Sequence, residues 1–344
     1  MHQHGGNPDL DCKRLGITSG EIIDFSVNVS PLGLPPQIRV LWDRLIVENE
    51  QYPTPYGERV KTFYHSRFGL PEDCVLPGNG SIDLIYDAPR TLGIRRASIP
   101  QPSFHDYQRS CKACGAEIIH TTAGRLDGCD AYFIGNPCNP AGGLTLAEEL
   151  LSLADMNPSV SFFVDEAFIQ LVDEPGRYSL LQRDRLRDNI IVFHSLTKVY
   201  ALPGLRVGAC VSTPATIERL EAKRPPWMVS RLAEQVAGAL VHCSDYEAEL
   251  RRMVRAERER IYQALKQSSA YEPVPGNANY LLTQWKATED LDDLLRSLLS
   301  QGLYVRDCRN FPTLEDNWFR IAIRRPEEND RLLEALKACK TIQA

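Results

Sequence analysis

Short apolar runs alternate with amphipathic helical patterns over roughly residues 54 to 215. The predicted strands are Ala97–Pro100, Glu117–His120, Ala131–Gly135, Ser161–Val164, Ile190–His194 and Val207–Ser212. Helical patterns lie between several of them, including Ser81–Leu92, His105–Cys114 and Thr145–Met156. Such alternation is typical of a largely parallel sheet with helices on both faces. In such sheets ligands bind beyond the strand ends, so the chemistry is expected in the loops that follow these strands.

The remainder of the chain has a different pattern. A charged helical region is predicted from about Ser230 to Gln267, with ion pairs on a solvated face. After it we expect the strands Tyr280–Thr283, Leu303–Arg306 and Phe319–Ile323 and the helices Asp290–Leu299 and Pro326–Lys340. Residues 1–35 are rich in Gly, Asn and Pro and are expected to be irregular. We therefore expect an α/β protein with an N-terminal arm (1–35), a large domain (36–240) and a smaller C-terminal α/β domain (241–344).

The composition of the chain excludes several classes of function. The 344 residues are 43% hydrophobic, which is ample for a large core. The net charge of −6 and the absence of a Lys/Arg-rich block argue against a nucleic-acid partner. The N-terminus lacks the features of a signal peptide, and no apolar run approaches a membrane span. Ten scattered cysteines predict a reduced, cytoplasmic protein. Cys111–Cys114 fits a CxxC pattern but has no second pair and no thioredoxin-like context, and the histidines lack metal-like spacing.

Lys198 is the residue whose setting points to a reaction. It lies in the turn Ser-Leu-Thr-Lys at 195–198, directly after an apolar run, and Arg206 follows behind a Pro-Gly bend. This layout suits an amine that bonds to a cofactor aldehyde while hydroxyls and a guanidinium hold the cofactor phosphate. Pyridoxal phosphate (PLP) combines these needs. The phosphate ligands expected from this segment are Ser195, Thr197 and Arg206.

Other strand ends carry side chains that suit the same cofactor. Asp165 is either a structural cap or the anion that keeps the pyridine nitrogen protonated, and its place upstream of Lys198 favours the second role. Asn139 is either a turn residue or a donor to the cofactor phenolate oxygen. Gly80 and Ser81 precede a helical pattern whose first N–H groups form a natural phosphate cradle. Phe104 is either ordinary core or a stacking partner of the pyridine ring.

These motifs resemble fold-type I PLP enzymes of the aspartate aminotransferase superfamily, over essentially the whole chain. The shared motifs are Asp-Glu-Ala-Phe at 165–168, Ser-Leu-Thr-Lys at 195–198 and Arg206. Within the superfamily the chain is similar to the branch that holds histidinol-phosphate aminotransferase and threonine-phosphate decarboxylase. The segments that favour the decarboxylase are His4–Asn7, Asp24–Gly33, Val305–Cys308 and Phe319–Arg324.

The resemblance implies a reaction. It is the PLP-dependent decarboxylation of L-threonine O-3-phosphate to (R)-1-aminopropan-2-yl phosphate, or of L-serine O-phosphate to ethanolamine phosphate, for the cobamide nucleotide-loop linker. A homodimer with shared active sites is implied as well. The implied cofactor contacts are Lys198 (covalent), Asp165 (pyridine nitrogen), Asn139 (phenolate), Phe104 (ring), Gly80, Ser81, Ser195 and Arg206 (phosphate), and Tyr52 (phosphate of the partner subunit). The implied substrate contacts are Arg320 (carboxylate), Asn28 beside it, and Arg306, Arg324, His4, Gly5, Gly6 and Asn7 (phosphate).

The sequence departs from the family pattern at three places. Cys138 replaces an asparagine of the usual Asn-Pro-Asn-Asn-Pro-Thr-Gly motif, Phe168 replaces the tyrosine usual in aminotransferases, and no acidic residue follows Ser81. Phe168 fits the decarboxylase better. A histidinol-phosphate-type aminotransferase remains the alternative, because it shares every cofactor residue and differs only at the substrate end. A DNA-binding regulator of this fold would carry a basic module ahead of the arm, which here is expected to begin near Met1.

Overall fold

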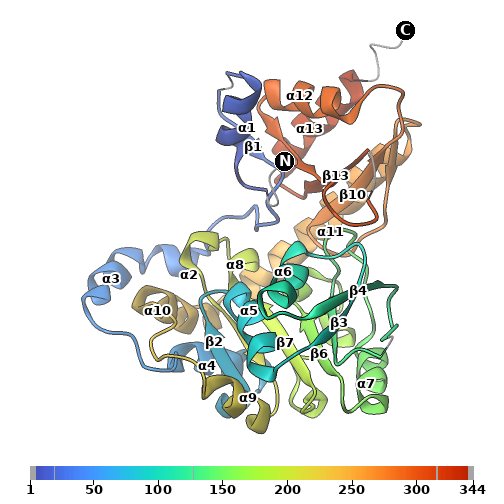
Figure 1. The fold of residues 1–344 in the computed structure, drawn as a ribbon. Coiled ribbons are helices and arrows are strands. Elements are labelled where there is room, and N and C mark those ends of the chain that lie inside the picture. The colour runs from blue at the N-terminus through green and yellow to red at the C-terminus, as the bar shows by residue number, and fades with distance from the viewer. Residues whose placement is uncertain (1–4, 19, 127, 315–316, 340–344) are drawn as a thin grey trace.

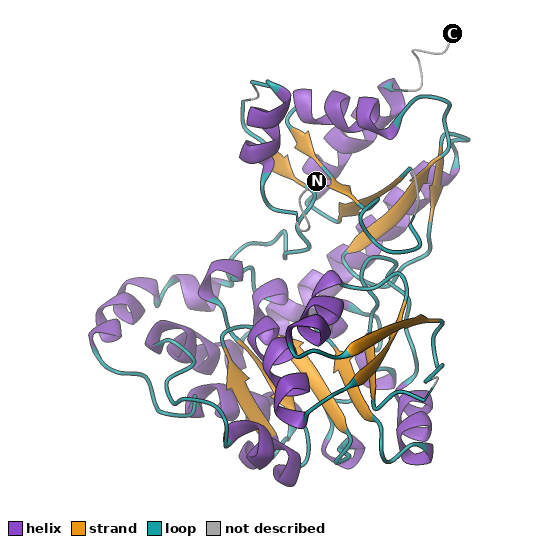
Figure 2. Ribbon diagram, viewed as in Figure 1, coloured by secondary structure: helices purple, strands orange, loops and turns teal. Residues whose placement is uncertain are grey.

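The computed structural model describes residues 5–18, 20–126, 128–314 and 317–339. Within them the strands form a seven-stranded sheet, a four-stranded sheet and a two-stranded sheet. Figures 1 and 2 show the large sheet with its helices in the lower part of the view and the smaller sheets in the upper part. No helix in the described part of the chain is both long and apolar enough to cross a membrane.

The seven-stranded sheet has the strand order β2-β8-β7-β6-β5-β3-β4. Its strands are β2 Val75–Gly78, β3 Arg96–Pro100, β4 Glu117–Thr121, β5 Ala131–Gly135, β6 Ser161–Asp165, β7 Ile190–Ser195 and β8 Gly208–Val211. Only the pairs that β8 makes with β2 and β7 are antiparallel, so the predicted largely parallel sheet is confirmed. β2 was not predicted. It contains Pro77, which is tolerated because β2 is an edge strand.

The described α-helices include the amphipathic segments that the sequence predicts. They are α1 Pro8–Leu15, α2 Pro36–Arg39, α3 Trp42–Val47, α4 Glu58–Phe68, α5 Ser81–Leu92, α6 His105–Ala113, α7 Ala147–Met156, α8 Leu196–Val199, α9 Pro214–Glu221, α10 Arg231–Ala239, α11 Ser244–Lys266, α12 Leu291–Ser300 and α13 Pro326–Ala338.

One expectation, that of an irregular N-terminal arm, is wrong. The arm is not wholly irregular, because α1 begins at Pro8, a residue whose fixed φ and missing N–H suit a first helical position. The predicted helical region from Ser230 to Gln267 is confirmed, and a 3-10 turn at Leu240–His242 divides it into α10 and α11. Acidic residues in the first turn of α11 stabilise its new N-terminus.

The upper part of the molecule contains the smaller sheets. β12 Arg306–Asp307, β13 Trp318–Ala322, β10 Tyr280–Trp285 and β9 Tyr271–Pro273 pair in that order, all antiparallel. β1 Ile23–Asp24 pairs in parallel with β11 Leu303–Tyr304, so the N-terminal segment lies beside C-terminal strands. The predicted single strand Leu303–Arg306 is therefore wrong. It divides at Val305 because its two halves pair with different strands.

Separate hydrophobic cores fill the two parts. On one face of the large sheet Phe163 stacks between Phe133 and Phe193, with ring centroids 4.4 and 5.9 Å apart. In each of these strands the residues next to the phenylalanine point to the core on the opposite face of the sheet, as strand geometry requires. The smaller core joins residues from α11 to α13 with Ile23 and Phe25 of the arm. α11 contributes to both parts, and the boundaries after residues 35 and 240 stay a prediction.

Candidate active site

A cavity of about 350 Å³ lies at the carboxyl ends of β5, β6 and β7. Its size is within the range of small-molecule sites, and its place is the one expected for a ligand of a parallel sheet. The cavity brings together most of the residues that the sequence singles out. These are Gly5, Asn28, Ser81, Phe104, Asn139, Asp165, Ser195, Thr197, Lys198, Arg206, Arg306 and Arg320.

Lys198 projects from α8, the short helix that follows β7. Ser195 caps this helix, since its Oγ accepts a hydrogen bond from Thr197 N at 3.4 Å and lies 2.8 Å from Thr197 Oγ1. Burial, together with the nearby Arg206 and Arg320, lowers the pKa of Lys198 to about 8, against the opposing charge of Asp165. Near neutral pH a much larger share of this lysine is therefore the neutral, nucleophilic amine than for an ordinary lysine.

Asp165 presents its carboxylate to the same cavity from the end of β6. Tyr107 Oη donates to Oδ2 at 2.8 Å, and the Ala167 backbone N–H donates to Oδ1 at 3.0 Å. Burial raises the pKa of Asp165, while these two donors and Lys198 oppose the rise. The sequence did not single out Tyr107. The signal that could have found it is its spacing, one helical turn after Phe104 on α6.

A phosphate-sized cup is formed where α5 begins. Gly80 has φ +78°, and a Cβ there would collide with the guanidinium of Arg206. At Gly208 a Cβ would lie 2.8 Å from Ser81 N, so a glycine in β8 lets the start of α5 pack against the sheet. The first turn of α5 has no side-chain cap, which leaves its N–H groups for an anion. Ser195, Thr197 and Arg206 line the cavity with this turn.

Arg320 is buried on β13, and polar groups hold it on several sides. Its Nη1 donates to Asn139 Oδ1, and its Nη2 donates to Ser26 O at 3.0 Å. With the Asn28 amide oxygen facing the guanidinium, it accepts from Nη1 at 3.2 Å and Nη2 at 3.3 Å. Arg320 Nε has no hydrogen-bond partner among the described residues. Burial lowers the pKa of Arg320, and the ring of Tyr280 lies 5.2 Å from its Cζ.

Arg306 lies on β12 directly opposite Arg320 in the antiparallel register. Side chains of opposite residues in such a pair lie on the same face of the sheet. Arg306 donates to Asp307 O at 2.6 Å and to Asn310 Oδ1 at 3.0 Å, and its Cζ lies 5.6 Å from the ring centroid of Phe311. The two strands therefore present two guanidinium groups to one cavity.

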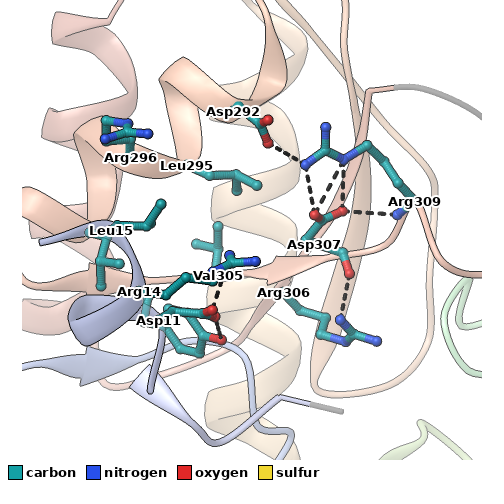
Figure 3. Close-up of a pocket in the computed structure, with 12 residues that line it drawn as sticks. Asp11, Arg14, Leu15, Asp292, Leu295, Arg296, Val305, Arg306, Asp307 and Arg309 are labelled. Carbon is teal, nitrogen blue, oxygen red and sulfur yellow. Dashed lines mark hydrogen bonds and ion pairs between the residues drawn. The ribbon is translucent and has the colours of Figure 1, made fainter. Parts of the chain in front are cut away.

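Arg306 also borders a second cavity, of about 390 Å³, between α1, α12 and the β11–β12 segment (Figure 3). In Figure 3 Arg309 faces Asp292 and Asp307, and Arg14 lies beside Asp11. The ion pairs already neutralise these two arginines. The described residues that line this cavity include no lysine and none of the phosphate-cup residues, so it is not the candidate site.

Several residues proposed from the sequence do not line the active-site cavity. Gly6 N donates to Ser26 Oγ at 2.8 Å, and Asn7 stands at the start of α1. Arg324 pairs with Glu328 at 2.8 Å instead of facing the cavity. Tyr52 is 83% exposed and packs against Trp227, with ring centroids 5.9 Å apart. His4 lies outside the described residues.

Comparison with known proteins identifies the family. Residues 21–336 match the class I and II aminotransferases. The chain belongs to this family. It is 33% identical to threonine-phosphate decarboxylase of Salmonella typhimurium, over 97% of this chain and 95% of that protein. The crystal structure of histidinol-phosphate aminotransferase from Clostridium acetobutylicum superimposes with a TM-score of 0.85 and 26% identity, covering 92% of this chain and 98% of the other.

A second aminotransferase structure contains the cofactor. Histidinol-phosphate aminotransferase from Sinorhizobium meliloti, in complex with pyridoxal 5'-phosphate, shares the fold with a TM-score of 0.84 at 19% identity, covering 97% of this chain and 95% of that one. The fold-type I PLP architecture expected from the sequence is confirmed. PLP is the cofactor of the family, and this aminotransferase-family site fits it. Lys198 supplies an amine of lowered pKa, Asp165 an anion, and the start of α5 with Arg206 a phosphate cup.

Proposed function

We propose that this PLP-dependent enzyme decarboxylates an O-phospho-amino acid, either L-threonine O-3-phosphate or L-serine O-phosphate. The observation that carries the proposal is the placement of Arg306 opposite Arg320 in the cavity that also contains Lys198. Such a substrate has two anionic ends, and a guanidinium binds a carboxylate or a phosphate through two parallel donors. Similarity to the Salmonella decarboxylase supports the same assignment.

Arg320 is the proposed partner of the substrate carboxylate. It is buried, and Asn28 and Asn139 fix its orientation. Its unpartnered Nε is a further donor in a buried setting, and such a donor gains free energy when an acceptor arrives. Arg306 is then the proposed partner of the substrate phosphate, and the ring of Phe311 lies 5.6 Å from its Cζ.

The remaining residues are proposed to position the reacting groups. Bound PLP supplies a ring that accepts the electrons released when the bond to the carboxylate breaks. Only a bond held perpendicular to that ring is weakened, so the two arginines select the bond by orienting both ends of the substrate. Asp165 would hold a proton at the pyridine nitrogen, and Phe104, which lines the same cavity, would stack on the ring. Lys198 Nζ, with a pKa of about 8, can exchange a proton near neutral pH.

We also propose a cytoplasmic homodimer with shared active sites. Exposed apolar side chains on the α2–α3 segment and the loop after it support a contact with a second copy. They are Val40, Ile46, Val47, Tyr52 and Tyr56. Tyr52 would then reach the cofactor phosphate of the partner subunit. All ten cysteines are free thiols, as is usual in a reducing compartment.

The test uses the PLP-loaded enzyme. Incubation with O-phosphothreonine should release carbon dioxide and 1-aminopropan-2-yl phosphate, and a parallel reaction with O-phosphoserine ranks the two substrates. The control reaction contains glutamate and imidazole-acetol phosphate. If 2-oxoglutarate forms there while neither phospho-amino acid loses carbon dioxide, the enzyme is instead a histidinol-phosphate-type aminotransferase, the activity named for the Clostridium structure.

A further inference from the structure

We propose that Tyr107 is a positioning residue that sets the charge and the direction of Asp165, and through it the protonation of the cofactor ring. The hydroxyl of Tyr107 donates to Asp165 Oδ2 at 2.8 Å. Because this hydroxyl is directed at Asp165, its proposed action is on the acid. The inference holds whether the enzyme decarboxylates or transaminates, because both reactions use the same cofactor ring.

Two aromatic neighbours hold the ring of Tyr107 in place. Its ring stacks on Phe133, with centroids 5.7 Å apart and planes 28° apart, and it meets Phe104 edge-on at 5.5 Å. The side chain is 2% exposed. A buried ring held between two aromatic neighbours has little rotamer freedom, so its hydroxyl is directed at one place. That place is the carboxylate of Asp165.

A glycine on the neighbouring strand leaves room for this hydroxyl. Gly135 ends β5 beside β6, and a Cβ at Gly135 would lie 3.2 Å from Tyr107 Oη. Any larger residue would push the hydroxyl or the chain aside by a few tenths of an ångström. The hydrogen bond therefore depends on residues from three separate elements, α6, β5 and β6.

The hydrogen bond matters because Asp165 must remain an anion in a buried place. Burial alone raises the pKa of its carboxyl, and the Tyr107 hydroxyl and the Ala167 N–H oppose that rise, each on its own oxygen. Burial and the adjacent Asp165 also hold the pKa of Tyr107 well above its ordinary value, so the tyrosine stays a donor. Without that donor the carboxylate becomes more basic and draws the shared proton away from the pyridine nitrogen.

The experiment is Tyr107→Phe, which removes one oxygen and keeps the ring. Tyr304→Phe is the matched control, because Tyr304 Oη also donates to a carboxylate, that of Asp11 at 2.5 Å, away from Asp165. Both variants are loaded with PLP labelled with ¹⁵N in the ring. In Tyr107→Phe the ¹⁵N resonance should move toward that of neutral pyridine, and kcat should fall about tenfold with KM changed by less than about twofold.

Tyr304→Phe should leave the ¹⁵N resonance in place. A second variant, Gly135→Ala, keeps the hydroxyl but displaces it, and should move the resonance in the same direction by less. The inference is overturned if Tyr107→Phe leaves the resonance and kcat as in the parent enzyme. It is also overturned if kcat falls while the resonance stays, since Tyr107 would then have only a packing role.

Discussion

Gly80 lies against the guanidinium of Arg206, in a space that a Cβ atom could not share with it. The backbone of Gly80, at φ +78° and ψ 166°, is also in a region almost confined to glycine. These two facts make position 80 the most constrained point of the phosphate cup. The start of α5 and Arg206 can then approach the same anion from two sides.

Gly80→Ala should therefore weaken PLP binding by about tenfold or more, because the added methyl displaces Arg206. Fluorescence titration of the apoenzyme with PLP measures the loss. Gly93→Ala is the control. Gly93 ends the same helix with φ +72°, yet a Cβ there meets nothing within 4 Å. The Gly93→Ala substitution should lower the free energy of unfolding by about 1 kcal/mol and leave PLP affinity unchanged. Equal PLP affinities in the two variants would contradict this account of the cup.

The pKa of Lys198 predicts how fast the apoenzyme captures its cofactor. Only the neutral amine attacks an aldehyde, so the rate of covalent capture, trapped with borohydride, should rise with pH around a midpoint near 8. An exposed lysine would give a midpoint near 10.4. Arg320→Met removes a positive charge that lowers this pKa, so its midpoint should lie higher. Lys198→Arg should capture nothing, and capture by this variant would exclude Lys198 as the bonded residue.

Arg306 and Arg320 should be separable by their response to simple anions. With O-phosphothreonine as substrate, inorganic phosphate should inhibit the parent enzyme competitively through Arg306. In Arg306→Met this inhibition should weaken by about tenfold or more, the amount expected for a lost charge-assisted bond. Arg320→Met should keep phosphate inhibition and lose inhibition by a small carboxylate such as acetate. The reverse pattern would exchange the two proposed roles.

Glu166, the neighbour of Asp165, predicts a pH-dependent stability. Its carboxyl is fully buried, accepts from Ser179 Oγ and Leu180 N at 2.6 Å each, and burial raises its pKa to about 8. The folded chain then binds more protons than the unfolded chain between about pH 4.5 and 8, so this group lowers stability as pH rises through that window. Glu166→Gln mimics the protonated form and should be more stable than the parent at pH 8, by up to roughly 4 kcal/mol.

Urea unfolding of the apoenzyme at several pH values tests this expectation. The stability difference between Glu166→Gln and the parent should shrink toward zero near pH 4.5. Glu148→Gln, a change on the exposed face of α7, provides the baseline. A difference that stays constant across the range would show that Glu166 does not titrate in this window.

Sequence patterns predicted the parallel strands and the residues at their ends because both depend on local order along the chain. Asp165, Ser195 and Lys198 follow buried strands, and parallel strands bring such positions to one edge. The division at Val305 could not be predicted this way, because it depends on which distant strand each half pairs with. Pairing is a long-range property that hydrophobic periodicity does not encode.

Tyr107 and Gly135 were missed for a similar reason. Each has an ordinary local explanation, a tyrosine in an amphipathic helix and a glycine at the end of a strand. Their relationship exists only across elements, through the hydroxyl that occupies the space beside the glycine. For Arg324 the substrate contact stays a prediction. Its motif suggested a substrate contact, but Glu328, one turn into α13, pairs with its guanidinium.

The guanidinium groups of Arg306 and Arg320 are carried by the small sheet, whereas Asp165 ends a strand of the large sheet and Lys198 lies on α8, directly after another of its strands. The residues proposed to bind the substrate and those proposed to act on the cofactor thus lie in different parts of the structure. Substitutions that change the shape of the β12–β13 pair can alter which substrate binds without moving Lys198 and Asp165. An enzyme built in this way can change its substrate range while its catalytic residues stay the same.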